Sequence, residues 1–583
     1  MRRLGWLAAI ALLGVAFPVA LVLRARAANR VDGFPLDDPW IHLTYARTLH
    51  DHHAFAYFPG RPASAGSTAP LYTLLLAAGF RVTHDEKVLS YALGLVFHAA
   101  FLGVAALWAR RQLGGTAWAG AFVALLALDP RIAILAVSGM ETSLFLFLVA
   151  LAFWARAAGR PVLPGVAVGL AVWVRPDALI LAAVFAIAGL VEGVTHPGRP
   201  RRQAWLVPFG LLVAAYLAFN LATGGVLLPN TFGAKRAYYN NHYVDPWATF
   251  VHRDLPAAFL VLGWRVVTPL ACLGLLLEAG RLLRRRSSAL VAEAGWAVAL
   301  PLAYLVLLPF AHRFSRYLVP ALPAVALLAL GVLKAGWARP AEPAPRWRSW
   351  GRLAAPLLLA WAVAWQVFGI PIADTNYTTL CRYHYQRHER TGRWLREHTQ
   401  PDAVVAAHDV GAIAYYSERR IVDVAGLIQP DAIPHLRKPD YTRFLRELFA
   451  RERVTHLAFM TNWLEVSNQE PLFTADENPE VLQVFAWIPE RTVLVPELAT
   501  RLNREAQLLA RRGDATAAVQ ALRQSVQVCP ESSRTWFLLG MAQQAAGDRA
   551  RAARAFREAL RLYPDARDAR EALAALPAPG AES

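Results

Sequence analysis

Long apolar stretches recur along the first two thirds of this 583-residue chain and largely stop near residue 372. About eleven of them approach the roughly 20 residues that a helix needs to cross a bilayer. They lie at 5–23, 88–109, 116–133, 140–156, 162–174, 177–194, 204–222, 257–280, 293–311, 316–334 and 352–372. Residues 70–82 are apolar as well, and we interpret them as a re-entrant or interfacial helix. The pattern predicts a polytopic α-helical membrane domain over residues 1–372.

The last third of the chain alternates strand-like and helix-like segments. Residues 373–495 predict a small α/β segment with a parallel sheet, in which AVVAAHDVGAIAYYS forms a strand, a turn at Asp409–Gly411 and a helix. RRIVDVAGL and VTHLAFM predict two further strands of the same sheet.

A repeat follows this α/β segment. Residues 513–530 match residues 547–564 at an offset of 34, each copy starting with Gly-Asp and ending with Pro. That period is typical of tetratricopeptide repeats. Two repeats are too few for an independent array, so we expect residues 500–575 to pack on the α/β segment or on a partner. Residues 576–583 predict a disordered tail.

The net charge of +18 does not by itself indicate nucleic-acid binding. The arginines gather in short loops between apolar runs, a membrane-topology pattern rather than a nucleic-acid-binding surface. With the first run as a retained signal anchor and the N-terminus in the cytoplasm, MRR, ARRQ and GRLLRRR are cytoplasmic. An odd number of spans then places residues 373–583 outside. We expect a multi-pass protein of the inner (plasma) membrane with extracytoplasmic C-terminal domains and no nucleic-acid partner.

Two adjacent carboxylates, Asp37 and Asp38, follow the first predicted span in LDDPWIHLTYARTL. Asp38 before Pro39 fits the N-cap of an interfacial helix, which leaves Asp37 unexplained. Alternatively, one of the pair is a general base, because neighbouring carboxylates can raise one another's pKa and such a base can take a proton from an acceptor hydroxyl. The local sequence leaves both interpretations open.

Six polar motifs fall in this order in the loops assigned outside: LDDPWIHLTYARTL, GSTAPLYTLLLA, SGMETSLF, RPDAL, LPNTFGAK and RYLVPALP. Over roughly residues 1–430 the chain resembles the GT-C superfamily of integral-membrane glycosyltransferases. The most similar branch contains mycobacterial cell-wall arabinofuranosyltransferases. The resemblance implies transfer of a hexosyl or pentosyl group, with inversion, from a polyprenyl phosphate to a cell-envelope glycan, lipid or protein. It also implies an acidic base in the first outer loop, for which we favour Asp38 over Asp37.

A phosphate leaving group needs cations more than a proton donor, and outer-loop polar groups can bind the sugar. The candidates for substrate binding are Lys235, Arg175, Arg313, Arg316, Glu141, Asn230 and His42. Simpler roles compete: arginines at a membrane surface can snorkel, and Glu141 and Asp177 can serve as helix starts.

Histidines cluster at 50–53 and 384–388, but neither cluster has carboxylate or cysteine ligands in register. We expect no metal cofactor, although a divalent ion is possible because some GT-C members require one. A second hypothesis is a non-catalytic membrane scaffold or receptor that recruits a protein partner through its repeats. A third is an oligosaccharide ligase with a diphosphate-linked donor.

Overall fold

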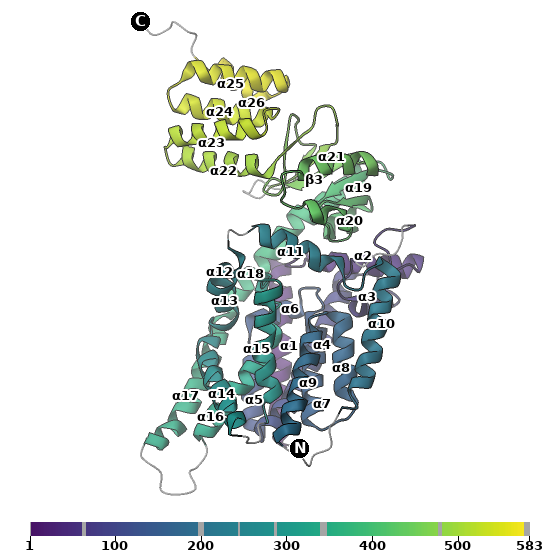
Figure 1. Ribbon diagram of the computed structural model, residues 1–583, viewed down its shortest axis with the longest axis vertical. Coiled ribbons are helices and arrows are strands. Elements are labelled where there is room, and N and C mark those ends of the chain that lie inside the picture. Colours follow the sequence, from purple (N-terminus) through teal and green to yellow (C-terminus); the bar gives the residue numbers. More distant parts are fainter. Residues whose placement is uncertain are drawn as a thin grey trace. The chain divides into compact units, whose positions relative to one another are not determined.

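A computed structural model describes residues 2–60, 66–195, 203–242, 245–284, 289–337, 347–475 and 481–576. The chain divides into two compact units, Met1–His384 and Tyr385–Ser583. The first unit is helical, and the second combines a small sheet with a helical array (Figure 1). The predicted tail lies, from residue 577 on, outside the described residues.

Six helical stretches among the described residues are long and apolar enough to cross a membrane. They contain α1 (Arg2–Asn29), α4 (Glu86–Leu113), α10 (Leu206–Gly224), α14 (Trp264–Leu283), α16 (Leu322–Trp337) and α17 (Trp347–Phe368). The pair α5 (Thr116–Ala127) and α6 (Pro130–Ala136), bent by 67°, can form a seventh span.

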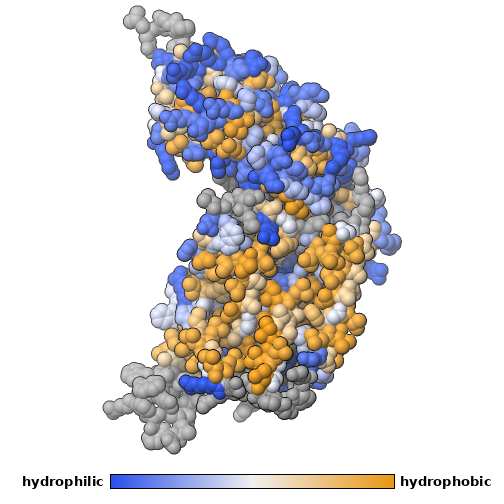
Figure 2. Space-filling view, in the orientation of Figure 1, coloured by the Kyte–Doolittle hydropathy of each residue, from blue (hydrophilic) through white to orange (hydrophobic). Residues whose placement is uncertain are grey.

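Five shorter apolar helices complete this unit. They are α3 (Pro70–Gly79), α7 (Thr142–Ala157), α8 (Leu163–Val174), α9 (Ala178–Thr195) and α15 (Val291–Leu307). Apolar residues cover the visible face of the helical unit in Figure 2, as expected for a surface in contact with lipid. Every predicted span overlaps one of these helices or the bent pair, so the polytopic helical fold is confirmed. The number of eleven crossings stays a prediction.

The break between α5 and α6 has a local cause. Asp129 accepts hydrogen bonds from the backbone N–H groups of Arg131 and Ile132, and Pro130 occupies the first position of α6. The same carboxylate accepts a bond from Trp264 Nε1 of α14 at 2.6 Å. An N-cap followed by proline starts a new helix, and the tryptophan fixes its direction.

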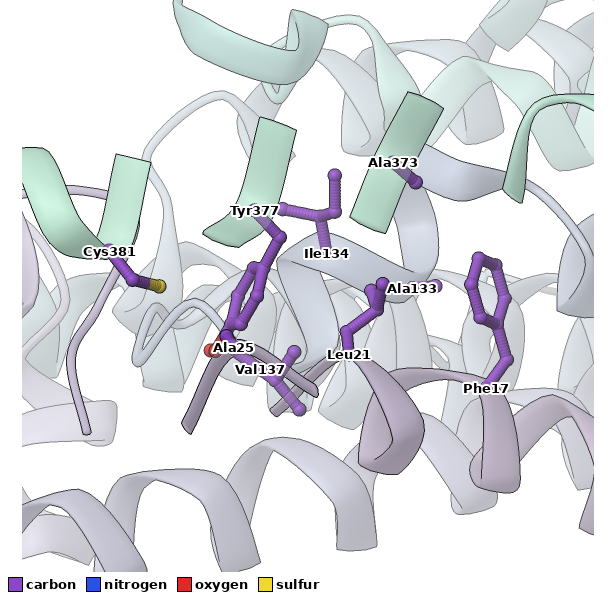
Figure 3. Close-up of a cluster of buried hydrophobic side chains, with 9 residues drawn as sticks. All are labelled: Phe17, Leu21, Ala25, Ala133, Ile134, Val137, Ala373, Tyr377 and Cys381. Atoms are coloured by element: carbon purple, nitrogen blue, oxygen red, sulfur yellow. The ribbon is translucent and has the colours of Figure 1, made fainter. Parts of the chain in front are cut away.

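Helix α18 (Ile370–His384) packs against α1 and α6. Its Tyr377 and Cys381 lie with Phe17 and Leu21 of α1 in a buried apolar cluster (Figure 3). The Tyr377 hydroxyl donates to the carbonyl of Val137 at 3.1 Å. This packing keeps α18 in the helical unit, which therefore extends beyond residue 372.

Short elements between the long helices carry most of the polar motifs. They are α2 (Asp38–His52), α11 (Asn230–His242), α12 (Pro246–Thr249), the π-helical turn η1 (Phe250–Asp254), α13 (Leu255–Phe259), and the 3₁₀ turns η2 (Arg313–Ser315) and η3 (Val319–Ala321). Nine consecutive or nearly consecutive side chains of α2 are buried, from Pro39 to Thr48. α2 is therefore packed into the unit on more than the one face that an amphipathic pattern predicts.

The second unit starts with the π-turn η4 (Tyr385–Glu389) and α19 (Arg390–His398) and contains a five-stranded sheet in the order β2-β1-β3-β6-β5. The strands are β1 (Val404–Ala407), β2 (Arg420–Asp423), β3 (His456–Met460), β5 (Phe473–Thr474) and β6 (Leu482–Ala486). The predicted strands β1, β2 and β3 are parallel, and α20 (Gly411–Ser417), η5 (Pro430–His435) and α21 (Tyr441–Glu452) lie in the crossovers.

The parallel pairing of the three predicted strands is confirmed, and two further strands that were not predicted extend the sheet. β6 pairs antiparallel to β3, and β5 antiparallel to β6. Seven residues connect β5 to β6, and parallel neighbours need a longer connection; among the described residues between β3 and β6 there is no helix.

Five helices form the C-terminal array: α22 (Glu497–Arg511), α23 (Ala515–Val528), α24 (Ser533–Ala545), α25 (Arg549–Leu562) and α26 (Arg567–Ala574). The repeated Gly-Asp has a physical explanation. Gly513 and Gly547 adopt φ values of +84° and +82°, which glycine tolerates best. Asp514 and Asp548 then cap α23 and α25 through their side chains.

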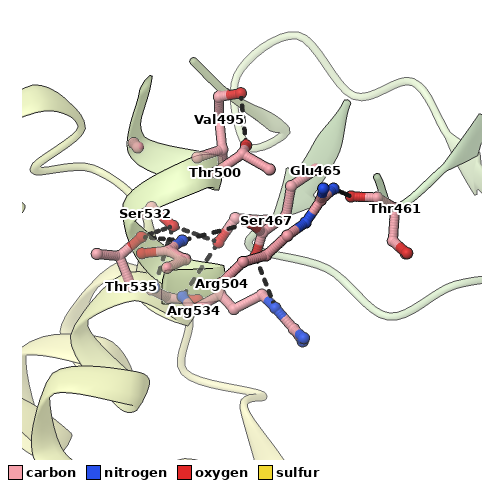
Figure 4. A network of polar contacts seen from close by, with 12 residues as sticks. Thr461, Glu465, Ser467, Val495, Thr500, Arg504, Ser532, Arg534 and Thr535 are labelled. Atoms are coloured by element: carbon pink, nitrogen blue, oxygen red, sulfur yellow. Dashed lines mark hydrogen bonds and ion pairs between the residues drawn. The ribbon is translucent and has the colours of Figure 1, made fainter. Parts of the chain in front are cut away.

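The array packs on the sheet part of its own unit. This is the first of the two predicted arrangements, packing on the α/β segment or on a partner. β4 (Glu465–Ser467) and β7 (Val493–Val495) form a two-stranded ribbon beside it. Ser532 donates to Ser467 at 3.2 Å, and Arg534 pairs with Glu465 at 2.7 Å (Figure 4). These polar contacts fix how the repeats sit on the ribbon.

Candidate active site

Asp38 is the first residue of α2, not its N-cap. Asp37 occupies the N-cap position, and its side chain makes no capping hydrogen bond. The interpretation of Asp38 as a capping residue is therefore wrong. Its carboxylate is directed instead to a residue that is distant in the sequence.

Asp38 pairs with Arg316, which follows η2. Oδ2 of Asp38 accepts a hydrogen bond from Nη2 of Arg316 at 2.7 Å, and His312 Nε2 lies 3.7 Å from the same oxygen. The Asp38 side chain is 30% exposed and that of Arg316 only 4%. Burial alone raises the pKa of Asp38, but the positive charges of Arg316 and Lys235 outweigh it and hold the pKa well below its ordinary value. The expected upward shift by the neighbouring carboxylate is wrong, because these cations dominate.

Arg175 lies between α8 and α9 and holds the Arg316 segment in place. Its Nη1 donates to the carbonyl of Arg316 at 3.1 Å, while Nε and Nη2 donate to both carboxylate oxygens of Asp177. Tyr304 of α15 accepts from Arg175 at 3.0 Å and donates to Asp177 at 2.7 Å. Most donors of Arg175 are thus engaged within the protein, which makes it a positioning residue for Arg316.

A cavity of about 390 Å³ opens beside these groups. Its polar wall comprises Thr68, Glu141, Arg175, Asp177, Thr231, Lys235, Tyr304, Arg316 and Tyr317, and its apolar wall includes Leu179, Ile180, Leu228, Phe232, Leu307 and Leu308. Lys235 donates from Nζ to the hydroxyl of Tyr317 at 2.9 Å. The cavity combines cations with an apolar side, which suits a ligand with an anionic head and a hydrocarbon tail.

Glu141 and His42 meet at the wall of this cavity. Glu141 precedes α7 and lines the cavity, whereas His42 of α2 does not line it. His42 Nε2 lies 3.7 Å from Glu141 Oε2, and both side chains are about 5% exposed or less. Of the two predicted substrate-binding residues, only Glu141 thus faces the space.

Two other residues predicted to bind substrate are not placed at the cavity: one lies away from it, and the side chain of the other is not described. Arg313 stacks on the ring of Tyr383 at 5.8 Å and does not line the cavity. Asn230 begins α11, but its side chain is outside the described part of the structure.

Among the described residues there is no group of three or more histidine, cysteine, aspartate or glutamate side chains arranged to hold a metal ion. In the second predicted histidine cluster, His388 contacts Asp409 at 2.8 Å.

Sequence reasoning missed Tyr304 and Tyr317 as members of the site. Their rings stack with centroids 5.2 Å apart, and the guanidinium groups of Arg175 and Arg316 lie 5.0 and 5.3 Å from the ring of Tyr317. Tyr317 follows Arg316 directly in the RYLVPALP motif, so the motif contained a signal for it. Tyr304 lies within a predicted span and had none.

The chain is similar to the crystal structure of ArnT from Cupriavidus metallidurans bound to undecaprenyl phosphate, with a TM-score of 0.53 and 12% identity over 83% of this chain and 98% of that chain. The apo form of that protein matches with a TM-score of 0.52 and 13% identity, over 84% and 99% of the two chains. The cryo-EM structure of arabinofuranosyltransferase AftD from Mycobacteria gives a TM-score of 0.46 and 14% identity, over 83% of this chain and 40% of that chain.

Family models match only the C-terminal part. Residues 376–519 match a domain of unknown function, DUF8728, and residues 533–566 match a tetratricopeptide repeat. No curated protein matches the chain significantly. At these identities the structural matches establish the fold alone. The chain is a multi-pass membrane protein with the GT-C fold, and it ends in tetratricopeptide repeats.

Proposed function

We propose that the protein is a membrane glycosyltransferase that takes a sugar from a polyprenyl-phosphate donor and transfers it to a hydroxyl of a cell-envelope acceptor. The observation that carries the proposal is the contact of Asp38 with Arg316, because Arg316 lines the cavity and holds the carboxylate of Asp38 next to it. In this proposal Asp38 is the general base and Arg316 is the cation that binds the phosphate. The undecaprenyl phosphate bound by the structurally similar ArnT supports a lipid-linked donor.

The donor phosphate would bind Arg316 and Lys235, with its hydrocarbon chain along the apolar wall. The charge of Arg316 lowers the pKa of Asp38, which makes Asp38 a weak base. A phosphate that draws on the charge of Arg316 and Lys235 would weaken that effect and make Asp38 more basic. Donor binding would thereby prepare the base for the acceptor.

The reaction is a single displacement with inversion. The acceptor oxygen forms a bond to the anomeric carbon while the bond from that carbon to the phosphate oxygen breaks. Asp38 takes the acceptor proton, and polyprenyl phosphate leaves with the bonding electrons, stabilised by the two cations.

The direct test is incubation of the purified protein, in lipid nanodiscs, with a panel of polyprenyl-phosphate hexoses and pentoses and simple hydroxyl acceptors. We expect acceptor-dependent release of polyprenyl phosphate with at least one sugar, and loss of release in the Asp38→Asn variant. A diphosphate-linked oligosaccharide in the panel checks the ligase hypothesis.

A non-catalytic scaffold is the alternative that the tetratricopeptide repeats favour, since helical repeats commonly bind proteins. The absence of release from every donor, together with a stable protein partner retained by the repeats, would favour it over the enzyme. In the enzyme, the same repeats would serve to recruit a partner or an acceptor.

A further inference from the structure

Two charged groups in the cavity wall have buried atoms that make no hydrogen bond to the described residues. They are the carboxylate of Glu141, at Oε2, and the guanidinium of Arg316, at Nε and Nη1. Their side chains are 5% and 4% exposed. A buried charged group without a hydrogen bond is costly, and a native site that contains one commonly satisfies it with a ligand or water.

The two groups need hydrogen-bond partners of opposite kinds. Arg316 offers N–H donors, which a phosphate oxygen accepts, whereas Glu141 offers an acceptor, which needs an O–H donor. Both line one cavity of about 390 Å³. A ligand that carries an anion and a hydroxyl group close together, as a sugar attached to a phosphate does, offers a partner to each of these two side chains.

Resting on the function proposed above, we propose that Glu141 determines specificity for the sugar by accepting a hydrogen bond from one of its hydroxyl groups. Arg316 binds the phosphate of every donor, but Glu141 contacts only the glycosyl part. Glu141 thereby distinguishes a glycosylated lipid phosphate from the bare product, and a hydroxylated sugar from its deoxy analogue.

His42 is the positioning residue for Glu141. Its Nε2 lies 3.7 Å from Glu141 Oε2, and its Nδ1 contacts Ser67 Oγ at 3.3 Å. Ser67 Oγ in turn lies 2.9 Å from Thr73 Oγ1 of α3. All four side chains are buried. This chain of contacts fixes the imidazole beside Oε2 of the carboxylate, and His42 itself does not line the cavity.

The experiment measures the affinity of the full-length protein in detergent for two probes. The first is a short-chain prenyl phosphate, and the second is the same prenyl phosphate with a sugar attached. The sugar is the one that supports release in the panel above, or each sugar of the panel is tested in turn. In the wild type we expect tighter binding of the glycosylated probe. Glu141→Ala should abolish that preference, a loss of about 10- to 100-fold, and should not weaken the binding of prenyl phosphate, because Arg316 remains and a neighbouring negative charge is removed.

A deoxy series locates the hydroxyl. The analogue that lacks the contacted hydroxyl should bind wild type as weakly as the parent sugar binds Glu141→Ala, and should lose nothing further in that variant. Equal losses for every analogue in Glu141→Ala, or a parallel loss of prenyl-phosphate affinity, would overturn the proposal. If wild type binds neither probe, the proposed function itself fails.

His42 is tested by rescue. His42→Ala should weaken the preference for the glycosylated probe, and His42→Gln, which keeps a side-chain N–H, should restore part of it. Thr48→Val is the matched control, because Thr48 is similarly buried on α2 and its hydroxyl donates to the backbone carbonyls of Thr44 and Tyr57. Identical behaviour of His42→Gln and His42→Ala would show that His42 only fills space.

Discussion

Oδ2 of Asp38 lies 2.7 Å from Nη2 of Arg316, although 278 residues separate the two in the chain. The contact joins the start of α2 to the turn before η3 and α16. It places a carboxylate beside the cation that lines the cavity. Replacement of either residue should therefore change catalysis in a specific way.

Replacement of Asp38 by Asn should lower kcat by about 10²–10⁴-fold, because the amide cannot accept the acceptor's proton. Affinity for prenyl phosphate should survive, since Arg316 and Lys235 remain. Turnover and binding are measured separately on the purified protein. Asp37→Asn is the control, and we expect a much smaller effect. Near wild-type turnover in both single variants and in the double variant would make the pair structural.

Arg316→Gln should move the acid limb of the pH profile of kcat/KM to higher pH. In the wild type the cations hold the pKa of Asp38 below its ordinary range, so Asp38 stays ionised from neutral pH down into acid. Without Arg316, burial counts for more, the pKa rises and the base is protonated at a higher pH. The profile is measured between about pH 4 and pH 8. A profile that changes only in height would argue against electrostatic control of Asp38.

Lys235→Ala should weaken the binding of a short-chain prenyl phosphate by about 10-fold, the size of one charge-assisted hydrogen bond. Lys235→Arg keeps the charge and should retain part of the affinity. Isothermal titration on the detergent-solubilised protein measures both. Arg236→Ala is the matched control, since Arg236 is exposed on the same helix. An equal loss in the control would point to a general effect of surface charge.

Asn503→Ala should weaken the packing of the repeats on the β4–β7 ribbon. Asn503 is fully buried and contacts Glu465, Thr535 and Ser525, so its removal leaves buried polar groups unsatisfied at a cost of about 1–3 kcal/mol. Hydrogen–deuterium exchange of α22 and α24 in the full chain should become faster. Gln520→Ala, at an exposed position of α23, should leave exchange unchanged; protection in α22 and α24 that stays at wild-type level in Asn503→Ala would contradict the role.

A reporter fused after residue 575 should be active only if it requires export. The expectation follows from arginine-rich loops on one side and an odd number of spans. Alkaline phosphatase and a cytoplasm-only fluorescent protein make the matched pair of fusions. Fluorescence from the second fusion would place the C-terminal domains inside and the proposed site on the wrong face.

Local pattern was enough to predict several features of this chain. Apolar runs of nearly bilayer length became helices because every backbone polar group in lipid must be bonded within the chain. The 34-residue period predicted the repeats, since each Gly-Asp turn and small-residue position recurs in the sequence. Strands β1, β2 and β3 were predictable because each is a short apolar run between turns.

The pairing of the site residues came from packing alone. No local signal joins Asp38 to Arg316, places His42 behind Glu141 or brings Tyr304 from the middle of α15 to Arg175. The direction in which the pKa of Asp38 shifts depended on the same packing, because charges act through space. Asp37 is a neighbour of Asp38 in the sequence, whereas Arg316 and Lys235 become neighbours only in the folded protein. Residue types within a motif reveal candidate chemistry; the distances between motifs, set by how the helices pack, determine which partners each side chain meets.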